Sequence, residues 1–168
     1  MNNIVLVGMP GAGKSTVGVL LAKSLGMDFV DTDLEIQRYH GMLLQDMIDE
    51  FGIEGFLKAE EETILRGSYN HAVIATGGSA VYSGKAMARL KERAVIIYLK
   101  ADLETIHRRI SNIATRGIAM GRDRTLSDIY YERARLYELY ADIIIDCDNK
   151  DAEGVVESIL ESLDNFNP

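Results

Sequence analysis

The chain alternates short apolar runs with longer stretches in which apolar residues recur at helical spacing. Five apolar runs are bounded by polar residues, and we expect them to be β-strands: 4–7, 29–30, 72–75, 94–99 and 143–145. Between the runs, apolar residues recur every three or four positions, as they do over 17–25. This alternation predicts an α/β fold in which helices cover a parallel sheet.

Polar residues follow three of the predicted strands. Asp31-Thr32-Asp33 follows the second strand, Thr76-Gly77-Gly78-Ser79 the third and Lys100-Ala101-Asp102 the fourth. Open parallel sheets bind ligands beyond the carboxyl ends of their strands. We therefore expect the functional site at this edge of the sheet.

Two stretches have a less regular pattern. Residues 33–67 have helical spacing interrupted at Gly41, Gly52 and Gly55, which predicts several short helices. Residues 111–125 are rich in arginine and glycine, with little apolar periodicity. Insertions after strands commonly bind an acceptor or form a mobile lid. We expect an acceptor-binding region at 33–67 and a lid at 111–125, within a single domain that spans 1–168.

Composition and charge narrow the class of protein. The 168 residues, 47% hydrophobic and 26% charged, are ordinary for one globular domain. The net charge of −8 argues against a nucleic-acid or anionic-membrane partner, because a protein that binds such a partner needs a broad basic surface. The chain lacks the features of a signal peptide or membrane span, so we expect a cytoplasmic protein. We also expect a monomer. Cys147, the single cysteine, is expected to be a small buried thiol.

The most specific pattern is G-x-x-x-x-G-K-S/T, which occupies residues 8–16. A predicted strand precedes it and a predicted helix follows it, as this phosphate-binding loop requires. Gly11 and Gly13 can adopt backbone angles closed to other residues, so N–H groups from Gly11 through Ala12 to Gly13 turn toward an anion. Lys14 is expected to place its charge at the β- and γ-phosphates of a nucleotide, Ser15 to bind Mg²⁺, and Thr16 to bind another phosphate oxygen.

Two carboxylates are candidates for chemistry at the γ-phosphate. Asp31 could hold a water on Mg²⁺, and Asp33 could accept the proton of an attacking hydroxyl. The alternatives are a helix cap for Asp31 and a solvated acid in the first helical turn for Asp33. We favour the functional interpretation for both.

Several basic residues are candidates for binding anions. Arg133 lies on the apolar face of its predicted helix, so its guanidinium must reach solvent, pair with Asp31 or Asp33, or bind an anion in a cavity. We favour the anion. Arg109 and Arg116 could contact a nucleobase and the transferring phosphoryl group, although a solvated role is equally open for each. Glu60-Glu61-Glu62 predicts a solvated helix face, with Glu60 as a candidate for orienting a base.

These segments in this order resemble the shikimate kinases, from about Ile4 to Leu160. The segments that carry the resemblance are 8–16, Asp31-Thr32-Asp33, 75–79, Arg116 and 133–137. The resemblance implies a three-layer P-loop fold, in which helices flank a five-stranded parallel sheet. It also implies phosphorylation of the 3-hydroxyl of shikimate by ATP with Mg²⁺.

By matching position, the resemblance also implies roles for single residues. Lys14, Asp33 and Arg116 would be catalytic, and Asp31 would reach Mg²⁺ through water. Asp33, Gly77, Gly78 and Ser79 would line the acceptor pocket, where Arg133 would pair with the carboxylate of shikimate. Arg116 would close over the phosphates and Arg109 would contact the adenine.

The chain departs from the family pattern at three positions. Leu57 stands where the family has an arginine that binds the substrate carboxylate, and Lys58 is the nearest replacement. Ser79 replaces a glycine and Gly117 a proline. One missing charge-assisted hydrogen bond lowers affinity about 10- to 150-fold. Two alternatives therefore stay open: a kinase for another small polyol or hydroxy acid, and an ATP-binding regulator that transfers nothing.

Overall fold

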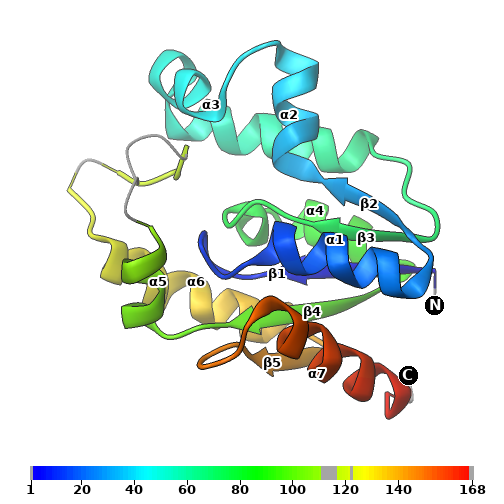
Figure 1. Ribbon diagram of the computed structural model, residues 1–168. Coiled ribbons are helices and arrows are strands. Elements are labelled where there is room, and N and C mark those ends of the chain that lie inside the picture. The colour runs from blue at the N-terminus through cyan, green and yellow to red at the C-terminus, as the bar shows by residue number, and fades with distance from the viewer. Residues whose placement is uncertain (1, 111–116, 122, 167–168) are drawn as a thin grey trace.

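The computed structural model describes residues 2–110, 117–121 and 123–166. In this part of the chain five strands form one parallel sheet in the order β2-β3-β1-β4-β5 (Figure 1). The strands are β1 (Asn3–Val7), β2 (Asp28–Asp31), β3 (Ala72–Ala75), β4 (Ala94–Lys100) and β5 (Ile143–Asp146). The predicted α/β fold is confirmed, and each predicted strand is present at its expected place.

Helices cover both faces of the sheet and make the three layers (Figure 1). On one face lie α1 (Lys14–Leu25) and α7 (Ala152–Asp164); on the other lie α4 (Gly84–Lys91) and α6 (Leu126–Tyr140). The short helix α5 (Leu103–Arg109) packs against α6, and the 3-10 helix η1 (Ala80–Tyr82) precedes α4. Every residue of β1 is buried, since central parallel strands are covered on both faces.

The predicted acceptor-binding region consists of α2 (Thr32–His40) and α3 (Leu44–Arg66). Helix α2 ends at Gly41, and α3 bends at Gly52, where the backbone has φ 70° and ψ 176°. The expected break at Gly55 is wrong, because this glycine has helical angles inside α3. Glycine weakens a helix by only about 1 kcal/mol, which the packing of α3 can offset. A second core lies here, formed by Ile36, Leu44, Met47, Phe56, Ala59 and Ala119.

Residues 117–121 of the predicted lid lie between the two cores: Gly117 and Ala119 adjoin the second core, whereas Ile118 and Met120 pack with the main one. Gly117 has φ 64°, and a Cβ on it would lie 2.4 Å from the Cβ of Leu44. Close contact between the two backbones therefore requires glycine here. Residues 111–116 and 122 lie outside the described residues, so the motion of the lid stays a prediction.

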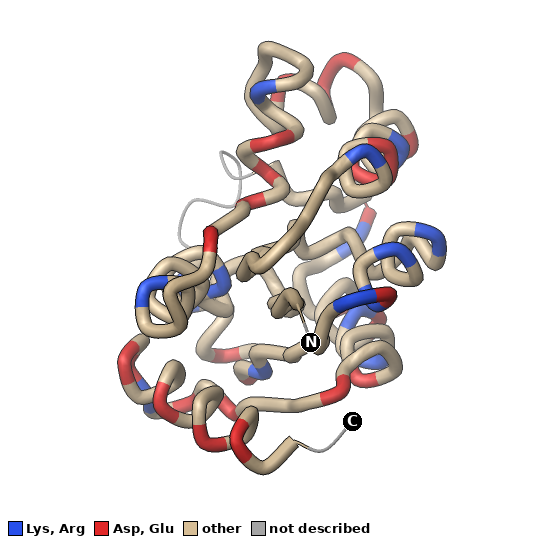
Figure 2. The backbone as a smooth tube through the Cα atoms, turned by 90° about the vertical axis from the view of Figure 1, so that its right-hand side faces the viewer, with Lys and Arg blue, Asp and Glu red and all other residues tan. Residues whose placement is uncertain are grey.

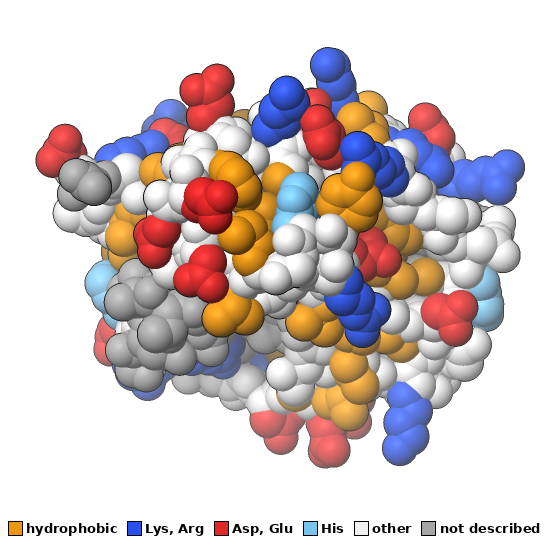
Figure 3. Space-filling view, turned by 90° about the horizontal axis from the view of Figure 1, so that it is seen from above, with side chains coloured by type: hydrophobic (Ala, Val, Ile, Leu, Met, Phe, Trp, Pro, Cys, Tyr) orange, Lys and Arg blue, Asp and Glu red, His pale blue; other side chains and the backbone are white. Residues whose placement is uncertain are grey.

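The surface mixes charged and apolar side chains. Lys and Arg are interspersed with Asp and Glu along the backbone rather than gathered on one element (Figure 2). The face seen from above, which α2 and α3 form, shows apolar side chains among charged ones (Figure 3). Exposed apolar residues of this region include Tyr39, Leu43 and Phe51. No helix within the described ranges is long and apolar enough to span a membrane.

Candidate active site

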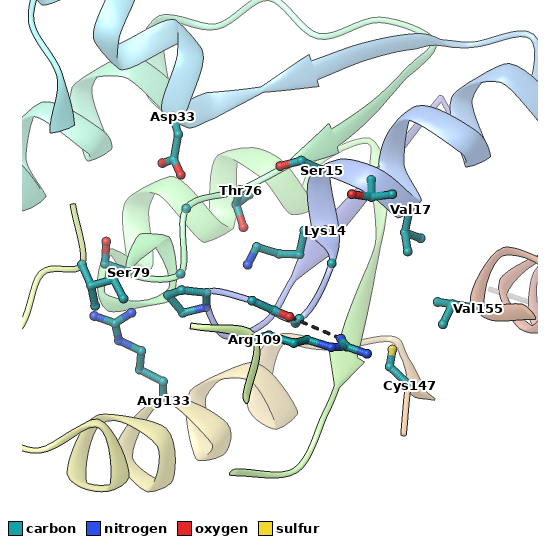
Figure 4. Close-up of a pocket in the computed structure, with 18 of the residues that line it drawn as sticks. Lys14, Ser15, Val17, Asp33, Thr76, Ser79, Arg109, Arg133, Cys147 and Val155 are labelled. Carbon is teal, nitrogen blue, oxygen red and sulfur yellow. Dashed lines mark hydrogen bonds between the residues drawn. The ribbon is translucent and has the colours of Figure 1, made fainter. Parts of the chain in front are cut away.

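A cavity of about 700 Å³ lies at the carboxyl ends of the central strands. It is lined by residues 10–13 of the loop before α1 and 14–17 of the first turn of α1, by Asp33 and Phe56, by 76–79, by Arg109, by 117–119, by Arg133, and by residues of 147–155. Lys14 lies between two ends of this cavity (Figure 4). We call these the Arg133 end, where Asp33, Ser79 and Arg133 lie, and the Arg109 end, where Arg109, Cys147 and Val155 lie.

The loop before α1 has the geometry of a phosphate cradle. Gly11 and Gly13 have φ of 84° and 98°, as the motif predicts. No side chain caps the N-terminus of α1, so the N–H groups of its first turn are available to an anion. The ammonium of Lys14 is buried and donates hydrogen bonds to the carbonyl oxygens of Gly8 at 2.8 Å and Met9 at 2.9 Å.

Burial lowers the pKa of Lys14 to about 8, while the nearby carboxylate of Asp33 opposes this shift. The ammonium therefore stays largely charged at neutral pH. A phosphate bound in the cradle would favour the charged form further. At this position Lys14 can act as a positive point charge that binds the phosphates of a nucleoside triphosphate.

Asp31 uses its two carboxylate oxygens for two different tasks. Oδ2 accepts a hydrogen bond from the hydroxyl of Ser15 at 2.7 Å. Oδ1 accepts from the backbone N–H groups of Asp33 at 3.0 Å and Leu34 at 3.3 Å, which caps α2. Asp31 therefore caps α2, as the alternative predicts, and the same side chain also contacts the hydroxyl of Ser15. Hydroxyl and carboxylate oxygens at this spacing have the chemistry that Mg²⁺ prefers.

Asp33 is half-buried and points into the cavity (Figure 4). Burial raises the pKa of its carboxyl to about 6, and the neighbouring charge of Asp31 adds to the shift. Lys14 acts in the opposite direction. Asp33 lies in the first turn of α2, as the alternative predicts, but its side chain is half-buried rather than fully solvated. A carboxylate with a pKa near neutrality, facing a phosphate cradle, can accept a proton from an alcohol.

Glu60 corrects the prediction of a solvated acidic face on α3. Its side chain is 2% exposed, and Oε2 accepts a hydrogen bond from the hydroxyl of Ser79 at 2.6 Å. Burial raises the pKa of Glu60 to about 7, and the charge of Asp33 adds to the shift. Sequence reasoning grouped Glu60 with its acidic neighbours. The available signal was its spacing of four from Phe56, which places both residues on the buried face.

Glu60→Gln is expected to raise the free energy of unfolding by about 2 kcal/mol at pH 8, with little effect near pH 4.5. The folded state holds the Glu60 proton more tightly than the unfolded chain does. Wild-type stability therefore falls as pH rises from the unfolded pKa of 4.5 to the folded pKa of about 7. The glutamine carries no charge and can still accept from Ser79. Urea denaturation at both pH values measures this, with the more exposed Glu62→Gln as control. An equal gain at both pH values would contradict it.

The turn 76–79 is anchored at each residue by a different part of the fold. The Thr76 hydroxyl donates to the carbonyl oxygen of Leu6 at 3.0 Å, and the Gly77 N–H donates to the hydroxyl of Thr32 at 3.1 Å. The Tyr137 hydroxyl donates to the carbonyl oxygen of Gly78 at 2.6 Å. The supporting roles of Thr32 and Tyr137 were missed, because nothing in the local pattern links them to the turn.

Gly77 lies directly against two acids. A Cβ on Gly77 would be 2.2 Å from Oε1 of Glu60 and 2.7 Å from Oδ1 of Asp33. These distances leave no room for a side chain. The turn therefore brings the carboxylates of α2 and α3 to one point on the wall of the cavity.

Arg133 lines the cavity and is 1% exposed. Its Nη2 donates to the carbonyl oxygen of Ala119 at 2.9 Å, and its Nε donates to the hydroxyl of Tyr82 at 3.3 Å. Within the described ranges no acid forms an ion pair with it. A buried guanidinium that faces a cavity without an acidic partner suits an anionic ligand.

The other predicted residues do not all line the main cavity. Arg109 lines the cavity, and its Nη1 donates to the carbonyl oxygen of Gly11 at 3.3 Å. Cys147 is buried as predicted, and burial raises the pKa of its thiol to about 12. Lys58 is exposed and lies on a smaller cavity beyond Ser79, apart from the cavity that Arg133 lines. Arg116 lies outside the described residues.

Comparisons with known proteins agree with this geometry. The family model described as Shikimate kinase matches residues 10–164. The shikimate kinase of Moorella thermoacetica is 37% identical over 162 residues, which cover 96% of this chain and 94% of that protein.

Solved structures give the same result. Shikimate kinase from Acinetobacter baumannii in complex with shikimate has a TM-score of 0.91 and 31% identity, covering 100% of this chain and 96% of its own. Shikimate kinase from Aquifex aeolicus has a TM-score of 0.81 and 32% identity, with 97% and 96% covered. Sequence and structure match over nearly the full length, and the chain belongs to the shikimate kinase family.

Proposed function

We propose that this protein transfers the γ-phosphoryl group of ATP to the 3-hydroxyl of shikimate. The observation that carries the proposal is that Lys14, Asp33 and Arg133 line one cavity. Lys14 lies in a phosphate cradle, Asp33 faces that cradle, and Arg133 presents a buried cation for a carboxylate. A hydroxy acid placed between Asp33 and Arg133 would present its alcohol toward the bound nucleotide.

Each of these residues would have a separate role in the phosphoryl transfer. N–H groups of the cradle and Lys14 would hold the phosphates of ATP, with the adenine toward Arg109. Asp33 would take the proton of the acceptor hydroxyl. The oxygen of that hydroxyl would then bond to the γ-phosphorus while the bond between this phosphorus and ADP breaks. Arg133 would pair with the acceptor carboxylate and fix the position of the alcohol. Arg116 would approach the phosphates from the lid.

Mg²⁺ would be held by Ser15 directly and by Asp31 through water. The 2.7 Å contact between the Ser15 hydroxyl and Asp31 supports this, because it places two oxygen donors together beside the cradle. Mg²⁺ is commonly bound by one or two protein oxygens together with substrate phosphates. When bound, it supplies positive charge to the phosphate oxygens during transfer.

The direct test is the initial rate of ADP release by the purified protein with Mg·ATP and increasing shikimate, against a control without acceptor. Saturation at sub-millimolar shikimate is the expected result. Absence of turnover, with ATP still bound in calorimetry, would reject shikimate as the acceptor.

A different small polyol or hydroxy acid is the second candidate acceptor, and Leu57 favours it. An aliphatic side chain stands where the family pattern has an arginine, and exposed Lys58 does not line the main cavity. Only Arg133 is then left among the described residues to pair with a carboxylate at this end. A panel of small alcohols assayed beside shikimate would show efficient turnover of another compound if this alternative holds.

A regulator that binds ATP and transfers nothing is the weaker alternative. Lys14, Ser15, Asp31 and Asp33 are all present and lie together at the cradle. A single turnover experiment with ATP and the acceptor panel separates this alternative from an enzyme.

Arg133→Ala is expected to raise the KM for shikimate about 10- to 150-fold, with a much smaller effect on the KM for ATP. The substitution removes the buried cation at the Arg133 end and leaves the cradle unchanged. Steady-state kinetics with each substrate varied in turn measures both constants. Arg135→Ala, an exposed position on the same helix, is the matched control. Equal effects on both substrates would assign Arg133 a structural role.

We also infer that the protein acts as a cytoplasmic monomer. The cradle, Asp33 and Arg133 all come from one chain, so the site needs no residue of a second subunit, which supports the monomer. Light scattering during size-exclusion chromatography measures the oligomeric state.

A further inference from the structure

The bond between Ser79 and Glu60 joins two buried groups that the proposed transfer does not use. Ser79 is 5% exposed and Glu60 is 2% exposed. The Ser79 hydroxyl donates to Oε2 of Glu60 at 2.6 Å, whereas Oε1 has no hydrogen-bond partner among the described residues. Ser79 is therefore the one described side chain that donates to this buried carboxylate.

The surroundings of Glu60 provide no ion pair to replace that donor. Among the described residues no Lys or Arg forms a salt bridge with Glu60. Leu57 lies one helical turn before it, and Leu57, Glu60 and Ser79 together line a smaller cavity of about 210 Å³. A buried carboxylate without an ion-pair partner depends on its hydrogen bonds. The hydroxyl of Ser79 thus fixes where the carboxylate lies.

That carboxylate touches the wall of the main cavity. Oε1 of Glu60 and Oδ1 of Asp33 both lie against Gly77, within 2.7 Å of where a Cβ would stand. A shift of Glu60 would press on Gly77 or approach Asp33, and it would also release Ser79 at the end of the turn. The position of Glu60 is therefore coupled to the residues that would meet the acceptor.

We propose that Ser79 is a positioning residue for the acceptor, whose hydroxyl holds the Glu60 carboxylate against Gly77 and so keeps Asp33 and the turn 76–79 in place. The inference rests on the proposed function, since it concerns the acceptor end of the same site. Ser79 acts through Glu60 rather than by touching the phosphates. Its loss should affect the acceptor and spare ATP.

The first test is the kinetics of Ser79→Ala. We expect the KM for shikimate to rise about tenfold while the KM for ATP stays unchanged. Ser79→Thr, which keeps the hydroxyl, should restore most of the affinity. Equal increases in both KM values, or no rescue by Ser79→Thr, would overturn the proposal.

Ser83→Ala is the matched control. The Ser83 hydroxyl also bonds to a glutamate of α3, Oε2 of Glu61 at 2.5 Å, and it caps α4 through the N–H of Ala86. Ser83 does not line the main cavity. Its removal should lower stability and leave the KM for shikimate unchanged. An increase in KM as large as that of Ser79→Ala would overturn the assignment to Ser79.

A second test does not need turnover. Carbon-13 NMR of the Glu60 carboxyl, assigned with Glu60→Gln, follows its titration in the free protein. The charged groups that act on it are Asp33 on α2, Lys14 on α1 and Arg133 on α6, and none of them changes in Ser79→Ala. Loss of the Ser79 donor should move the titration of Glu60 to higher pH. An unchanged titration would overturn the proposal, whereas failure of the wild type to phosphorylate shikimate would reject only the proposed function.

Discussion

Asp33→Asn is expected to lower kcat for the acceptor by about 10²- to 10⁴-fold while ATP binding stays intact. Asparagine keeps the size and position of the side chain but cannot take a proton from an alcohol. Asp33 faces the cradle without contributing to it, since the phosphates would be held by N–H groups and Lys14. The substitution therefore separates proton transfer from nucleotide binding.

Steady-state rates and calorimetric titration with ATP measure the two effects of Asp33→Asn. Glu35→Gln is the control, because it makes the same change of charge on the same helical turn but does not line the main cavity. Unchanged turnover in Asp33→Asn would remove Asp33 from the mechanism. Loss of ATP affinity as large as the loss of rate would instead indicate a damaged cradle.

Lys14→Met is expected to lower kcat by about 10²- to 10³-fold, the effect of removing one preorganised donor from a developing negative charge. The ammonium is buried between the carbonyl oxygens of Gly8 and Met9 at the mouth of the cradle. Methionine has a similar length without the charge. Burial lowers the pKa of Lys14 to about 8, so burying its charge carries a cost in the free protein. The variant should therefore fold at least as stably as the wild type.

The measurement is a turnover assay combined with thermal unfolding of Lys14→Met. Lys23→Met, an exposed position in the last turn of the same helix, controls for the loss of a positive charge. Turnover within tenfold of the wild type would show that Lys14 does not stabilise the transferring group. A large fall in the unfolding temperature would mean that the loss of rate reflects misfolding.

The sequence alone was sufficient for those features that depend on local physics. Strand positions followed from short apolar runs, because central parallel strands are buried on both faces. The cradle followed from Gly11, Gly13 and Lys14, since its geometry needs residues that are adjacent in the chain. The place of Arg133 on the apolar face of its helix followed from helical spacing. Even the bend of α3 at Gly52 was visible as a glycine in a helical pattern.

Only the tertiary structure decided which side chains meet across elements. Glu60 looked like part of a solvated acidic run, yet its partner Ser79 is 19 residues away on the turn after β3. The two tasks of Asp31 depend on Ser15, which lies on another element. Leu57 and Lys58 both line the smaller cavity beyond Ser79, and neither lines the main cavity. Spacing predicts which face a residue occupies, whereas its partner depends on how helices and turns pack, and that packing involves residues distant in the chain.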